Sequence, residues 1–153
     1  MKLDSREVPH VVVGAMMEVH RQLGAGFPVE AYRACLAQEF RFREIFFKRD
    51  AECRIDYKGV EVPVAWTMDF VVEGMVVLNC YCVDELTVAH AERLKNQLRM
   101  TGFETGFLVN FQASDLRKGG VRRLIVSSEA PEVRWRAYGM EEAEEGSAPP
   151  ASG

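Results

Sequence analysis

Hydrophobic residues recur at helical spacing through the first forty positions of the chain. The first segment, about residues 6–23, is followed by a Gly-Ala-Gly turn at 24–26, and glycine there favours the end of a helix. A second segment begins near Pro28, a residue tolerated in the first turn of a helix, and extends to about Arg43. The hydrophobic positions of these two predicted helices are Val12, Ala15, Met16, Val19 and Leu23, then Tyr32, Cys35, Leu36 and Phe40.

Beyond residue 50 the period changes to the alternation that is typical of β-strands. Stretches 51–57 and 60–66 flank Lys58-Gly59, and stretches 67–72 and 75–83 flank Glu73-Gly74. Because dipeptides that end in glycine favour tight hairpin turns, the pattern predicts a meander of antiparallel strands. Pro63 has no backbone N–H to donate, which indicates a sheet edge or a bulge.

A third helix is predicted between Thr87, a suitable N-cap, and Gly102, a suitable residue for a helix end. Its hydrophobic stripe consists of Val88, Ala91, Leu94 and Leu98. Strands are predicted over 106–111, 122–127 and 132–138. The order of helix, helix, strands, helix, strands predicts an α+β or mixed α/β domain, with helices flanking a mixed central sheet.

Composition adds a domain division to this picture. The chain has 153 residues, 48% of them hydrophobic, which suffices for one core. We expect a single domain over 1–138 and a disordered tail over 139–153, whose Gly, Pro, Ala and Ser residues are poorly suited to packing. The tail carries the excess charge: without Glu141, Glu142, Glu144 and Glu145 the acidic and basic residues balance at 19 each. A neutral core does not favour a strongly basic nucleic-acid binder.

The same sequence favours a soluble, cytoplasmic protein with reduced thiols. No apolar run approaches the roughly 20 residues of a membrane span, and the first ten residues lack an apolar signal-peptide core. The four cysteines do not show the paired spacing of a disulfide scaffold. Cys80 and Cys82 form a C-x-C pair on the apolar face of their strand, which favours two buried small hydrophobes over a metal site.

Three stretches together carry a resemblance to a known family. They read VVVGAMMEVHRQLGAGFPVEAY near the start, MDFVVEGMVVLNCYCVDEL in the middle, and HAERLKNQLRMTGFETGFLVNF followed by KGGVRRLIV. In order and spacing, over roughly residues 8–127, they resemble the GxxExxY family, a small bacterial group of the PD-(D/E)xK nuclease superfamily. The resemblance implies a mixed sheet flanked by helices, in agreement with the pattern above.

The resemblance also implies a chemistry, which is metal-assisted hydrolysis of phosphodiesters. One strand supplies a carboxylate, and the next supplies a second carboxylate two residues before a lysine; together they hold Mg²⁺ and activate water. Residues two apart on a strand share a face, so the anion and the cation of Glu-x-Lys stand together beside the first carboxylate. Mg²⁺ in such a site stabilises negative charge that develops on oxygen.

Several positions of this motif are altered here. Asp69 matches the first carboxylate, but Asn79 stands where the family has Glu, and Tyr81 stands where it has Lys. Asn79 and Tyr81 should share the catalytic face, with Leu78, Cys80 and Cys82 on the opposite one. Three further degenerate positions are Val29, in place of the family's Glu, and Arg93 and Gln97, in place of its Gln and Tyr.

The expected consequence is a pseudo-nuclease. Asparagine offers a neutral carbonyl, and tyrosine carries no positive charge at neutral pH, so metal affinity and water activation both suffer. We therefore expect no catalytic residues and no cofactor, and Asp69 is a weak candidate as a metal ligand. Mg²⁺ is expected only in the alternative of an active nuclease with a rearranged site. In that alternative Glu30, Glu73 or Asp84 supplies the missing ligand.

The positions that retain the family's residues are mainly glycines, aromatic residues and packing groups. Loss of the reaction with retention of the fold favours a protein-interaction or accessory subunit, with a protein partner or a second copy of the chain. The alternative is a non-cleaving nucleic-acid-binding module, in which Arg117, Lys118, Arg122 and Arg123 contact phosphates, as could Arg93, Lys95 and Arg99. The retained residues are Glu18, His20, Gly24, Gly26, Tyr32, Asp69, His90, Gly102, Asn110 and Phe111.

Overall fold

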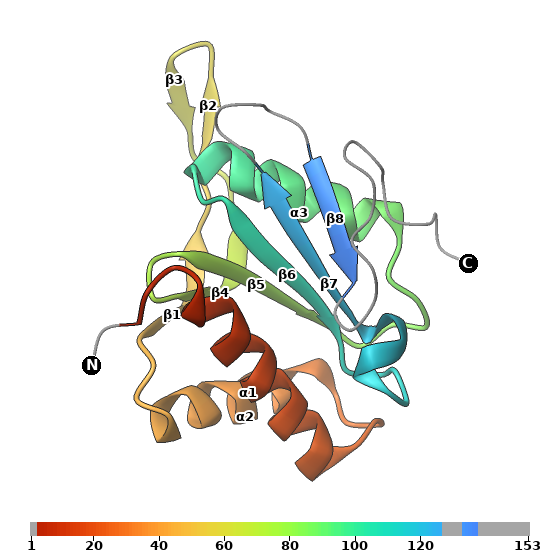
Figure 1. The fold of residues 1–153 in the computed structure, drawn as a ribbon. Coiled ribbons are helices and arrows are strands. Elements are labelled where there is room, and N and C mark those ends of the chain that lie inside the picture. The colour runs from red at the N-terminus through yellow and green to blue at the C-terminus, as the bar shows by residue number, and fades with distance from the viewer. Residues whose placement is uncertain (1–2, 127–132, 138–153) are drawn as a thin grey trace.

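The fold consists of three layers, with a mixed sheet between two groups of helices (Figure 1). The computed structural model describes residues 3–126 and the backbone of 133–137; the predicted tail, 139–153, lies outside the described residues. Helices α1 (Glu7–Leu23) and α2 (Val29–Phe42) cover one face of the sheet, and α3 (Val88–Thr101) covers the other. The predicted fold class is therefore confirmed.

The main sheet has six strands in the order β1-β4-β5-β6-β7-β8. All neighbours are antiparallel except β5 and β6, which run parallel because α3 crosses between them. A separate hairpin, β2-β3, projects from one end of the sheet (Figure 1). The strand bounds are β1 (Phe47–Glu52), β2 (Ile55–Tyr57), β3 (Val60–Val62), β4 (Thr67–Val72), β5 (Val76–Tyr81), β6 (Thr105–Asn110), β7 (Val121–Val126) and β8 (Val133–Ala137).

The predicted hairpin over 51–57 and 60–66 was wrong in its extent. Pairing is confined to Ile55–Tyr57 and Val60–Val62, because Pro63 cannot continue the ladder. Residues 47–52 instead form β1, an edge strand that pairs with β4. The first half of β1 was not predicted because FKRDAE carries four charged residues, as edge strands often do.

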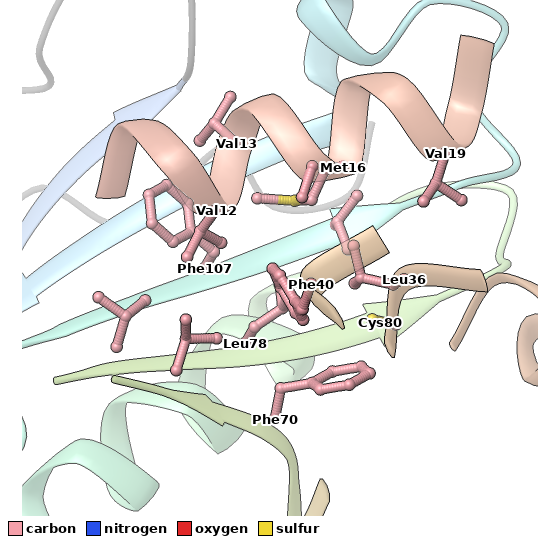
Figure 2. Packing of buried hydrophobic residues seen from close by; sticks show 14 of the residues in the cluster. Val12, Val13, Met16, Val19, Leu36, Phe40, Phe70, Leu78, Cys80 and Phe107 are labelled. Atoms are coloured by element: carbon pink, nitrogen blue, oxygen red, sulfur yellow. The ribbon is translucent and has the colours of Figure 1, made fainter. Parts of the chain in front are cut away.

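Two hydrophobic cores lie on the two faces of the sheet. On the α1–α2 face, Val12 and Met16 of α1 pack with Phe40 of α2 over Leu78 and Phe107 of the sheet (Figure 2). On the opposite face, the apolar side of α3 packs on β4, β5, β6 and β7. The close approach of α3 requires Gly106 on β6, where a Cβ atom would lie 2.7 Å from Cδ1 of Leu94.

The helix ends follow the predicted signals. Thr87 is the N-cap of α3, and its backbone N–H donates to Nδ1 of His90, 2.8 Å away. Gly102 ends α3 in the left-handed conformation, with its N–H donating to the carbonyl of Leu98. Pro28 precedes the first residue of α2 instead of occupying its first turn. None of the helices in the described part of the chain is long and apolar enough to cross a membrane.

Candidate functional site

Strands β4 and β5 part at Asp69, and side chains bridge the gap between them. Backbone pairing extends from Val72 opposite Val76 to Phe70 opposite Leu78. Beyond Phe70, the N–H of Asp69 donates to Oδ1 of Asn79 at 3.1 Å, and the N–H of Cys80 donates to Oδ2 of Asp69 at 2.7 Å. The two polar side chains thus satisfy backbone groups that a regular ladder would have paired.

Asn79 continues this bridge to helix α3. Its Nδ2 donates to Oε1 of Gln97 at 2.6 Å, and Nε2 of Gln97 donates to the carbonyl of Thr67 at 3.0 Å. Both amides are buried, with 2% and 0% of their surfaces exposed. A buried polar network is stabilising only when its members find partners, and these two amides supply complementary donors and acceptors.

The second oxygen of Asp69 faces a guanidinium group. Arg33, on α2, places NH2 3.5 Å from Oδ1 of Asp69, and only 20% of the aspartate side chain is exposed. Burial raises the pKa of Asp69, and the Cys80 N–H and the Arg33 charge oppose that rise. Both carboxylate oxygens therefore have partners from the chain itself.

Tyr81 occupies the other side of the sheet from Arg33. It packs against the α3 core, and its ring lies 4.5 Å from the imidazole of His90, centroid to centroid. Burial raises the pKa of Tyr81 to about 12, so the phenol is neutral at physiological pH. A neutral phenol supplies neither the positive charge of a lysine nor a base.

Asn79 and Tyr81 lie on the α3 face of the sheet, next to Asp69. Asn79 accepts from the Asp69 N–H and Tyr81 packs on His90, whereas the Asp69 carboxylate contacts Arg33 of α2 and also experiences the charge of Arg93 on α3. The opposite orientation of Leu78 and Cys80 is as predicted, because both pack in the α1–α2 core. All four cysteines are free.

An open depression of about 510 Å³ lies between the start of α2 and the end of β5. Val29 and Tyr81, two of the degenerate positions, both line it, together with Phe27 and Cys82. Phe27 is 46% exposed at this surface. Among the described residues that line the depression, none carries a charge. Its chemistry therefore suits an uncharged group better than a phosphate or a metal ion.

The residues present do not fit Mg²⁺. That ion prefers carboxylate oxygens with free lone pairs in an octahedral arrangement. Here Asp69 is engaged through both oxygens, and Asn79 and Tyr81 are neutral and bonded or packed elsewhere. Within residues 3–126, no three His, Cys, Asp or Glu side chains are grouped so as to hold a metal ion.

The comparison with known families places this geometry in context. Residues 6–124 match a family model described as PD-(D/E)XK nuclease superfamily, and this span includes both helical layers, strands β1, β4, β5 and β6, and most of β7. The chain belongs to the PD-(D/E)XK nuclease superfamily. No curated protein and no solved structure matches the chain significantly.

In this superfamily member, the retained motif residues near α2 have structural contacts. The buried Tyr32 donates its hydroxyl to the carbonyl of Gly24 and accepts from the N–H of Phe27 at 3.2 Å. Its ring lies parallel to that of Phe111, 4.6 Å away. Gly26 adopts φ 110°, which glycine alone enters readily. These contacts fix the loop that joins α1 to α2.

The other retained residues are also engaged locally. His20 donates from Nε2 to the carbonyl of Ala113 at 2.8 Å, and His90 caps α3 on the other side of the sheet, so the two histidines do not share a cleft. Asn110 bonds both the N–H and the carbonyl of Val83. Glu18 accepts from Arg21 and Gln22, which lowers the pKa of Glu18 to about 2.

The four predicted phosphate contacts do not form one cluster. Arg122 lies opposite Leu108 and Arg123 lies opposite Phe107, two residues that belong to the cores on opposite faces of the sheet. Residues that face each other across an antiparallel pair share a face, so Arg122 and Arg123 point apart. Arg117 and Lys118 are exposed together on the short helical turn Leu116–Gly120.

Of the substitute ligands expected for an active, rearranged site, Glu30 contacts the same guanidinium as Asp69, whereas Glu73 and Asp84 are engaged elsewhere. Glu73 lies in the β4–β5 turn, about 13 Å along the strand from Asp69, and accepts from the N–H of Phe46. Asp84 accepts from Gln112. Glu30 is held by Arg33 and Arg49. Arg33 was not predicted as a site residue because an arginine on the polar side of a helix usually faces solvent.

Proposed function

We propose that this chain is a pseudo-nuclease of the GxxExxY type, with a degenerate motif, that acts as a protein-interaction or accessory subunit. The observation that carries the proposal is the state of Asp69, whose oxygens accept from Cys80 and face Arg33. Asn79 and Gln97, which stand at two altered positions, bond each other directly. The centre where a metal and water would be held is filled by the chain's own hydrogen bonds.

The loss of catalysis is tested with purified protein and labelled DNA and RNA in Mg²⁺ or Mn²⁺. We expect no cleavage, because several members of one catalytic unit are missing together, and each such loss alone typically lowers rates by about 10² to 10⁴. Metal-dependent cleavage that Asp69→Ala abolishes would contradict the proposal. Arg21→Ala, which alters an exposed ion pair on α1, is the matched control.

A reversion series locates the loss. Asn79→Glu, Tyr81→Lys and Val29→Glu restore the family's residues, and Gln97→Tyr is added because Oε1 of Gln97, which accepts from Asn79, would otherwise face a carboxylate oxygen. Cleavage recovered by the fourfold variant and not by the threefold one would show that the amide pair blocks the site. Cleavage by neither variant would show that losses outside these four positions also matter.

The interaction role is supported by the uncharged depression beside Val29 and by the exposed Phe27 on its rim. Hydrophobic and aromatic side chains at a surface pocket are the usual anchors of protein interfaces. Affinity purification from the native organism, with a nucleic-acid stain on the same sample, is the test. We expect a protein partner that Phe27→Ala weakens and Met100→Ala, a change at a 38% exposed residue of α3, does not.

The alternative, a non-cleaving nucleic-acid-binding module, is supported by the exposed pair Arg117 and Lys118. Phosphate contacts release counterions, so binding through them weakens steeply with salt. Salt-sensitive retardation of DNA or RNA that is lost in Arg117→Ala/Lys118→Ala, without a protein partner, would favour this alternative over the accessory role.

A further inference from the structure

Arg33 lies at the centre of the charged groups on the α2 face of the site. Its guanidinium contacts Glu30 at 3.1 Å, Asp50 at shorter range, and Asp69 at 3.5 Å. Only 17% of the Arg33 side chain is exposed, and Nε is buried. The three carboxylates come from α2, β1 and β4, so one cation joins three elements of the fold.

Asp50 adopts an unusual backbone conformation that brings it into this group. Its φ is 50°, in the left-handed region that residues other than glycine seldom enter, although it lies within β1. Arg49 pairs with Phe70 and Ala51 pairs with Met68. Asp50 and Asp69 lie between these two pairs, on neighbouring strands. In this conformation the Asp50 side chain forms an ion pair with Arg33.

The charge balance of the group resembles that of an occupied cation site. Arg49 neutralises part of Glu30 through a 2.7 Å contact, and Arg33 is the cation that contacts both Asp50 and Asp69, with the charge of Arg93 on α3 also acting on Asp69. Two carboxylates this close to each other would repel strongly without a cation between them. In an active nuclease of this superfamily a divalent ion beside the first carboxylate would provide that charge.

We propose that the Arg33 guanidinium takes the place of the divalent cation, neutralising Asp69 and Asp50 from within the chain. This inference rests on the proposed loss of catalysis and explains how Asp69 is retained without its metal. Arg33 is then a positioning residue that makes the fold independent of divalent ions. Its removal should leave Asp69 and Asp50 without the cation that they share, so that a divalent ion can bind to these two carboxylates.

The test measures Mn²⁺ binding by electron paramagnetic resonance and thermal unfolding with and without Mn²⁺, using the full chain. We expect the Tm of the wild type to be unchanged by Mn²⁺. Arg33→Gln should lower Tm by roughly 3–6 °C, since a half-buried carboxylate loses its partner. Mn²⁺ should then raise the Tm of Arg33→Gln, with binding at least about tenfold tighter than to the wild type.

Control variants separate this role from a purely structural one. Asp69→Asn added to Arg33→Gln should remove the Mn²⁺ response, which would assign it to this group of residues. Arg33→Lys should restore the insensitivity to Mn²⁺, because lysine supplies the charge. Arg21→Gln, which removes the partner of Glu18 on α1, should gain no Mn²⁺ affinity.

Two outcomes would overturn the inference. One is Mn²⁺ binding to the wild type that Asp69→Asn abolishes; the other is a folded Arg33→Gln variant that binds Mn²⁺ no better than the wild type. If Arg33→Gln does not fold, the same comparison is made with Asp50→Asn/Arg33→Gln, which has one carboxylate fewer to neutralise and should retain a weaker Mn²⁺ response. Both outcomes are measured without cleavage of a nucleic acid. A failure of this inference is therefore distinguishable from a failure of the proposed function, which the cleavage assay detects.

Discussion

Tyr32 and Asp69 are both positions at which the chain retains the motif residue, yet their surroundings differ in kind. Around Tyr32 the contacts are a stacked ring and hydrogen bonds to backbone groups of the α1–α2 loop. Around Asp69 they are an ion pair and hydrogen bonds that reach both helical layers. The first region needs the residue to fix a loop, whereas the second joins β4, α2 and α3 through polar contacts.

The largest effect in this comparison is expected at Tyr32. Tyr32→Ala removes a fully buried ring and should lower the free energy of unfolding by about 3–5 kcal/mol, as large aromatic truncations do. Tyr32→Phe keeps the stack with Phe111 and leaves the Gly24 carbonyl without its donor, so a loss of about 1–2 kcal/mol is expected. Urea unfolding measures both; equal losses would mean that the hydroxyl, not the ring, carries the stability.

The amide bridge should have an intermediate effect. Asn79→Ala leaves the Asp69 N–H and Oε1 of Gln97 without partners and should lower the free energy of unfolding by about 2 kcal/mol. In a double-mutant cycle with Gln97→Ala we expect a coupling of about 1 kcal/mol. A coupling near zero would show that the two amides are satisfied independently, and Gln22→Ala on α1 is a control for amide loss at the surface.

Smaller effects are expected in the pH dependence of stability, with opposite signs for Asp69 and Glu18. Burial raises the pKa of Asp69 above its usual 3.8, so its contribution to stability is greatest below pH 3.8 and declines as the pH rises through the folded-state pKa. The stability difference between wild type and Asp69→Asn should accordingly decrease from acid to neutral pH. Urea unfolding at several pH values measures it, and an increase with pH would contradict the burial described for this carboxylate.

Glu18 should behave in the opposite way, with the smallest effect. Its pKa is lowered from 4.5 to about 2 by hydrogen bonds from Arg21 and Gln22, so its contribution is complete above pH 4.5 and is lost as the pH falls towards 2. Relative to Glu18→Gln, the wild type should lose stability across that window. Because the pair is exposed, the difference should shrink at high salt, and a salt-insensitive difference would argue against an ion pair.

The sequence predicted most of the framework because its signals are local. The alternation of TMDFVV and the Glu73-Gly74 turn gave the β4–β5 hairpin, and Thr87 and Gly102 gave the limits of α3. Strand β1 was incomplete in the prediction because its charged side chains hide the alternation, and its partner β4 lies beyond an intervening hairpin.

The site was predicted only in part, since its decisive contacts are not local. The spacing of two residues predicted that Asn79 and Tyr81 share one face of the sheet, and in the structure that face is the one covered by α3. The pairing of Asn79 with Gln97, and of Asp69 with Arg33, joins residues far apart in the chain, and no periodicity indicates such pairs. One signal was present: two of the altered positions both carry carboxamides, which are complementary hydrogen-bonding groups.

Gly106 shows that the dimensions of the site are set partly from outside it. The missing side chain lets α3 lie close to β6, with Leu94 filling the space that a Cβ would need. Gln97 is carried by the same helix, and its 2.6 Å bond to Asn79 spans the same gap between helix and sheet. A methyl group at position 106 would push α3 away from β6 through Leu94. The bond between Gln97 and Asn79 would then lengthen, although neither amide is altered. Gly106 therefore sets the distance between α3 and the sheet, and with it the length of the hydrogen bond between Gln97 and Asn79.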